Sequence, residues 1–138
     1  MTAYDARTGI ELLDRDTCLG LLAADVIGRI AVVDGGAAHI LPVNYALDGD
    51  VVVFRTDPGT KLDAGPRGRV AFEIDAFDRA RHTGWSVVVA GRLEEVDEHD
   101  TRTVARLRQL DLAPWAGGVK GHWMRLVPER ITGRRVGT

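Results

Sequence analysis

Alternating apolar and polar residues dominate the chain after Gly28 and predict a sheet built from short strands. Residues 69–75 show the pattern most clearly, because Val70, Phe72 and Ile74 fall on one face of a strand. Several of the runs are separated by Asp- and Gly-containing turns of the kind that join hairpin strands. The predicted strands are residues 29–33, 38–47, 51–56, 69–75, 85–96 and 122–127.

Only two long segments have helical periodicity. Residues 16–25 predict a helix with Asp16 as its N-cap, and residues 98–110 predict a second helix. A parallel sheet needs a helix between most neighbouring strands, so an antiparallel barrel is favoured. The chain, residues 1–138, is therefore predicted to be one domain, mainly β with minor α, built on six antiparallel strands.

Two residues mark irregular points in the predicted strands. Pro42 lacks a backbone N–H, so it is expected on an edge strand or at a bulge. Gly91 interrupts a long strand and predicts a bulge or a barrel corner.

Composition narrows the function classes. The chain is 45% hydrophobic and 28% charged, which is enough for a packed core. Its net charge of −2 argues against a general nucleic-acid binder, which needs a surplus of Lys and Arg. No membrane span, no signal peptide and no internal disulfide are expected, since Cys18 is the single cysteine, so the predicted location is the cytoplasm.

The chemistry-bearing residues do not form a recognisable catalytic motif. The four histidines lack the close spacing of metal ligands, so no metal site is predicted. Ser86 lacks the flanking glycines of a hydrolase nucleophile. An enzymatic function would therefore need a bound cofactor to supply the chemistry.

One short segment has the composition of a phosphate site. Arg55 and Thr56 end a predicted strand, and Lys61 follows after a turn, at the start of a short predicted helix over residues 60–64. A guanidinium, a hydroxyl, an ammonium and the N–H groups of a helix start all suit a terminal phosphate.

The order of motifs along the chain resembles the pyridoxamine 5′-phosphate oxidase-related family, and more narrowly its short, nitroimidazole-resistance-like branch of FMN-binding split barrels. The motifs that carry the resemblance, in chain order, are GRIAVVDGGAAHILPVNYALDGDVVVFRTDPGTKLD, VAFEID, GWSVVVAGRLEEV and a final W-x-R-L-x-P-E-R-I-T-G-R-R. Together they span about residues 12–135.

This resemblance implies a six-stranded split barrel that forms a homodimer, with FMN held between the two copies. Pro42, Val43 and Asn44 match the strand whose backbone lies along the flavin ring. Arg55, Thr56 and Lys61 match the phosphate-binding strand end and turn. Trp85, Ser86 and Arg134 match further positions near the cofactor, Arg134 more loosely.

The expected function is therefore an FMN-dependent oxidoreductase that passes hydride or electrons to a small organic acceptor. The basic cluster is small, so the deazaflavin F420 is an alternative cofactor. A second possibility is a non-catalytic protein that binds flavin, F420 or haem; His39 or His122 would serve as a haem ligand only if it faced a pocket. Asn44 also has a plainer interpretation, a hydrogen bond to a neighbouring turn.

Overall fold

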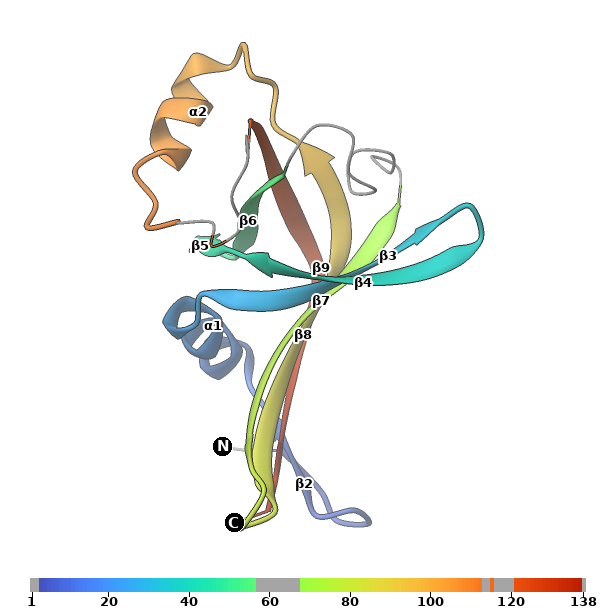
Figure 1. The fold of residues 1–138 in the computed structure, drawn as a ribbon. Coiled ribbons are helices and arrows are strands. Elements are labelled where there is room, and N and C mark those ends of the chain that lie inside the picture. The colour runs from blue at the N-terminus through green and yellow to red at the C-terminus, as the bar shows by residue number, and fades with distance from the viewer. Residues whose placement is uncertain (1–2, 57–67, 113–114, 116–120, 138) are drawn as a thin grey trace.

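One antiparallel sheet organises the molecule, as the computed structural model shows for residues 3–56, 68–112, 115 and 121–137 (Figure 1). Its main path runs β1-β2-β9-β8-β7-β3-β4, while β6 pairs with β9 and β5 pairs with β6. The strands are β1 (Ala3–Asp5), β2 (Ile10–Leu13), β3 (Ile27–Asp34), β4 (Ala37–Asn44), β5 (Ala46–Asp48), β6 (Val51–Thr56), β7 (Arg69–Asp78), β8 (Thr83–Glu95) and β9 (His122–Val136). The helices are α1 (Arg15–Ala24) and α2 (Thr101–Leu107).

The mainly β, antiparallel prediction is confirmed, but the sheet differs from the expected six strands. Each predicted strand is present, and the sheet over the described residues has nine. The predicted strand 38–47 divides at Tyr45 into β4 and β5, and β1 and β2 were not predicted. Those two strands have only three and four residues, so they are too short to show an alternating pattern. The path from β1 to β4 does not close into a ring within the described residues.

The inner face of the sheet carries the apolar core. Alternate residues of each strand point inward, so Val70, Phe72 and Ile74 of β7 are all buried, as the alternation predicted. α1 covers part of this core with Cys18 and Leu22, both fully buried. Burying such side chains is the main source of stability for a domain of this size.

Tyr45 attaches the end of α1 to the corner between β4 and β5. Its hydroxyl donates a 2.6 Å hydrogen bond to the Leu22 carbonyl, and its backbone N–H donates to the Val26 carbonyl. Its ring meets the Phe72 ring edge to face, with centroids 4.8 Å apart. Burial raises the pKa of the Tyr45 hydroxyl, which therefore stays a neutral donor.

The N-cap of α1 is Asp14, not Asp16 as the sequence predicted. The Asp14 carboxylate accepts a 2.8 Å hydrogen bond from the Thr17 N–H, and that bond lowers the Asp14 pKa. Both aspartates suit a helix start, but only Asp14 has the extended backbone that a cap requires. Asp16 instead lies in the first turn, where its charge favours the helix dipole.

Two glycines are required for close approach of the backbone. A Cβ at Gly133 would lie 2.6 Å from Cys18 Sγ, so glycine there lets α1 pack against β9. A Cβ at Gly91 would lie 2.1 Å from the Val127 carbonyl oxygen. Gly91 pairs with Pro128 while Ala90 pairs with Arg130, so the bulge predicted at Gly91 is confirmed. The extra residue, Glu129, belongs to β9.

The opposite side of the sheet is only partly covered. α2 packs on the N-terminal end of β9 and on β6, over the small cluster of Val53, Val96, Leu107 and Trp123. Neither of the two described helices covers the outward residues of β4, β3, β7, β8 and the C-terminal half of β9. We call this surface the outer face. Pro42 lies on β4, which pairs only with β3 among the described strands, so its predicted edge position is confirmed.

Neither described helix is long and apolar enough to cross a membrane.

Candidate functional site

The outer face is organised in rows of directly paired residues. Side chains that pair across neighbouring strands project from the same side of a sheet, so each row can be read from the register. The first row is Asp75, Ser86 and Arg134; the second is Pro42, Arg29, Glu73, Val88 and Thr132; the third is Ile40, Ala31, Ala71, Ala90 and Arg130. Most members that are not charged are small or apolar.

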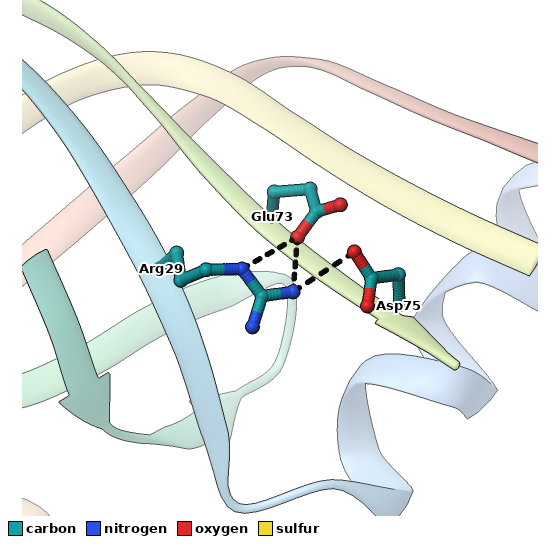
Figure 2. Close-up of polar contacts among 3 residues, drawn as sticks. All are labelled: Arg29, Glu73 and Asp75. Atoms are coloured by element: carbon teal, nitrogen blue, oxygen red, sulfur yellow. Dashed lines mark hydrogen bonds and ion pairs between the residues drawn. The ribbon is translucent and has the colours of Figure 1, made fainter. Parts of the chain in front are cut away.

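A three-residue ionic cluster occupies the middle of the outer face (Figure 2). The Arg29 guanidinium on β3 donates from Nε to Glu73 Oε1 at 3.1 Å, and its terminal nitrogen contacts the same oxygen. That terminal nitrogen also lies 3.0 Å from Asp75 Oδ2. The three side chains are between 32% and 42% exposed, so water still reaches them.

The cluster has more negative than positive charge. Two carboxylates and one guanidinium give −2 and +1, which leaves −1 when all are ionised. Burial is the first cause that raises the Glu73 pKa, and the neighbouring Asp75 raises it further. The hydrogen bond to Glu73 in turn raises the Arg29 pKa. Arg29 therefore compensates its two partners incompletely.

Four of the residues predicted from the resemblance lie on the outer face. Ser86 and Arg134 pair directly across β8 and β9. Pro42 is exposed and lies in the same row as Arg29 and Glu73. Asn44 is two residues further along β4, and its amide group bridges two segments: Oδ1 accepts a 2.8 Å bond from the Trp115 N–H, and Nδ2 donates to the Val26 carbonyl.

Val43 and Trp85 lie on the other side of the sheet. Val43 packs against the core. Trp85 also packs against the core and lines a pocket of about 420 Å³ at the end of the β7–β8 hairpin, which Phe77, Arg81 and Arg135 also line. The structure therefore does not bring Trp85 together with its neighbour Ser86, because successive strand residues point to opposite faces.

The side chains of Arg55 and Thr56 also point to opposite sides of β6. The Arg55 guanidinium lies over the Trp123 ring, 4.9 Å from its centroid, on the side that α2 covers. Thr56 is 4% exposed on the other side, and its hydroxyl makes no hydrogen bond to any part of the chain that the structure describes. Such a buried donor is costly unless a partner satisfies it. Lys61 and the predicted helix 60–64 lie outside the described residues.

His122 lies next to Thr56, since the two residues pair across β6 and β9. Its Nδ1 atom is 2.5 Å from Glu95 Oε1. His122 and Glu95 line a hollow of about 390 Å³ together with Asp97, Glu98 and His99. This lining is rich in carboxylates, whereas a haem needs a mainly apolar pocket.

The residues of the ionic cluster were not identified from the sequence. The alternation over residues 69–75 that placed Phe72 inward also places Glu73 and Asp75 together outward, so part of the signal was present. The partnership with Arg29 depends on pairing between strands more than forty positions apart, and no local pattern encodes it.

Comparison with known families identifies the class of protein. Residues 14–135 match the sequence profile of the pyridoxamine 5′-phosphate oxidase family, so this chain belongs to that family, as its motifs predicted. An uncharacterised protein of Mycobacterium tuberculosis is 36% identical over 137 residues, which are 95% of this chain and 88% of that relative.

Two solved structures extend the similarity to the fold. The FAD-binding protein from Mycobacterium smegmatis is 33% identical, with a TM-score of 0.73, over 92% of this chain and 98% of that protein. A conserved protein of unknown function from Corynebacterium diphtheriae is 32% identical, with a TM-score of 0.77, over 91% and 96% of the two chains.

Proposed function

We propose that this chain binds a flavin nucleotide between two copies of itself. We further propose that it is an oxidoreductase, which uses the bound flavin to reduce a small organic acceptor. The observation that carries the proposal is the similarity to the FAD-binding protein from Mycobacterium smegmatis, which extends over nearly the full length of both chains. FMN is the ligand predicted from the motifs, and FAD enters because that relative is named for it. Both ligands contain the same ring and a phosphate.

Two features of the geometry support an assignment of residues to the two ends of such a ligand. The buried Thr56 hydroxyl lacks a partner among the described residues and directly precedes the segment that contains Lys61, so it fits a phosphate oxygen. Pro42 and its neighbours on the edge strand β4 have backbone groups outside the ladder, which suit the polar edge of a flavin ring. When bound, the flavin would supply hydride and electron transfer, while the protein orients it and excludes water.

Titration of the purified chain with FMN, FAD, riboflavin and F420 tests the ligand. We expect FMN or FAD to bind at least about tenfold more tightly than riboflavin, because only the nucleotides have a phosphate. Equal affinity for riboflavin would contradict the phosphate assignment. Tight binding of F420 alone would show that F420, and not a flavin, is the cofactor.

Variants locate the phosphate end. Thr56→Val should lower the affinity for FMN towards that for riboflavin and leave riboflavin binding unchanged. Thr101→Val, an exposed threonine at the start of α2, is the matched control. Lys61→Ala and Arg55→Ala are expected to act in the same direction as Thr56→Val, from the sequence motif. Anaerobic bleaching of the bound flavin by NADH or NADPH then tests the oxidoreductase activity itself.

A further inference from the structure

The outer face has the surface composition of an interface. Two large apolar side chains on the β3–β4 hairpin, Val33 and Ile40, are 72% and 70% exposed and project from this side. The outward residues in the middle of β8, namely Ser86, Val88 and Ala90, are uncharged and short, and the larger Arg92 and Glu94 follow only near the end of the strand. Small residues allow another sheet to approach to the usual spacing of about 10 Å.

The charges on the outer face are separated by strand. The acidic excess lies on β7, where Glu73 and Asp75 share Arg29. Two exposed arginines, Arg130 and Arg134, lie on β9, and neither forms an ion pair with the described residues. β8 separates the acidic strand from the basic strand, with Asp75, Ser86 and Arg134 in one row.

This arrangement is self-complementary under a twofold rotation. A twofold axis that runs parallel to β8, between the two stacked sheets and over Ser86, exchanges the positions of β7 and β9 between two copies. The basic strand of each copy then lies over the acidic strand of the other. Ser86, on the axis, is small enough for the two sheets to meet there.

We infer that two copies of this chain pack outer face to outer face, with Arg134 of each copy paired with Glu73 and Asp75 of the other. The inference rests on the proposed function for the existence of a homodimer, and it adds the surface, the axis and the pairing. Covering the carboxylates removes the water that now reaches them, and a buried negative charge without a partner is costly. The partner subunit's Arg134 supplies the missing cation. This gives Arg134 an interface role in place of a direct contact with the flavin.

Charge reversal tests the pairing. In a dimer of Arg134→Glu, both contacts between the copies place the new carboxylate at position 134 against the acidic cluster. In a dimer of Asp75→Lys, both contacts place Arg134 against a cluster that now has a net positive charge. We expect each variant to self-associate at least about tenfold more weakly than the wild type in sedimentation. In an equimolar mixture, each contact of the heterodimer joins position 134 to an Arg29–Glu73–Asp75 cluster of opposite net charge, so heterodimers should form in preference to either homodimer. Native mass spectrometry of differently tagged chains measures that ratio.

A control variant on the same strand tests whether the effect is specific to Arg134. Arg130→Glu is the matched control, since Arg130 is an exposed arginine on the same strand but in the row of small residues. It should not restore association with Asp75→Lys, and rescue by it instead of Arg134→Glu would overturn the register. A statistical mixture, unchanged self-association of both variants, or a monomeric wild type would also overturn the inference. Flavin titration is measured separately, so a dimer with this pairing that takes up no flavin would contradict only the proposed function.

Discussion

The two faces of strand β7 contain adjacent residues but have opposite characters. On the inner face, Phe72 and Ile74 are almost fully buried, and their neighbours come from the same chain. On the outer face, Glu73 and Asp75 remain about one-third exposed and share one arginine. The inner face is thus complete within one copy, whereas the outer face is left with uncompensated charge and exposed apolar side chains. We therefore expect changes to the inner face to alter folding, and changes to the outer face to alter association and binding.

The largest effect should come from truncating the inner face. Phe72→Ala removes a fully buried ring that contacts Tyr45, and should lower the free energy of unfolding by about 3–5 kcal/mol. Phe77→Ala is the matched control on the same strand, because Phe77 is 63% exposed; its cost should stay within about 0.5 kcal/mol. Urea unfolding followed by circular dichroism measures both. Equal losses would contradict the division between the faces.

A smaller effect is expected where α1 joins the inner face. Tyr45→Phe keeps the ring but removes the donor to the Leu22 carbonyl, which leaves a buried acceptor unsatisfied. We expect a loss of about 1–2 kcal/mol in the free energy of unfolding. Tyr4→Phe changes a 60% exposed tyrosine and should have no measurable effect. If the two variants unfold alike, the hydrogen bond to α1 contributes nothing.

The inner face could be predicted from the sequence because its signal is local. Alternation over residues 69–75 identified Val70, Phe72 and Ile74 as core, and the helix start was misplaced by only two residues, between two aspartates of the same chemistry. The rest of the sheet was harder. β1 and β2 are too short to show a period, and the second half of β9 continues past Pro128 because the bulge accommodates that residue.

The candidate site was only partly predictable, because it depends on faces and on pairing. Motif order identified Ser86 and Arg134, which the structure pairs, and Arg55 with Thr56, which it separates to opposite sides of β6. Adjacent positions in a strand cannot share a face, so a motif of neighbouring residues overstates their proximity. Arg29, Glu73 and Asp75 come together through non-local pairing, which motif order does not describe.

On the outer face, removing the shared cation should affect association more than folding. Arg29→Gln leaves Glu73 and Asp75 as neighbouring like charges, but both are solvated, so the loss in unfolding free energy should be under about 1 kcal/mol. Self-association should be weakened more than folding, because the partner copy then buries a larger negative charge. Arg92→Gln, an exposed arginine on β8 that lies 3.8 Å from Glu94, is the control and should change neither quantity. A large folding defect in Arg29→Gln would show that the cluster belongs to the core.

The smallest effect is the pH dependence of stability, and its sign separates the two regions. In one copy the Glu73 pKa is raised above 4.5, mainly by burial, so the folded state disfavours the charged carboxylate. The stability that Glu73 contributes is present below pH 4.5 and is lost as pH rises through its higher folded pKa. The difference in unfolding free energy between wild type and Glu73→Gln should therefore fall over that range, at dilutions where the chain is monomeric.

Asp14 should behave in the opposite way. Its pKa is lowered below 3.8 by the hydrogen bonds at the start of α1, so its contribution is present above that value and is lost as pH falls through the folded pKa. Asparagine also caps helices well, so the difference between wild type and Asp14→Asn should grow as pH rises. Association should reverse the direction of this pH dependence for Glu73 but not for Asp14, because the partner subunit's Arg134 favours the charged carboxylate of Glu73. If Glu73→Gln responds to pH identically in dilute and concentrated protein, Glu73 receives no cation from a second copy.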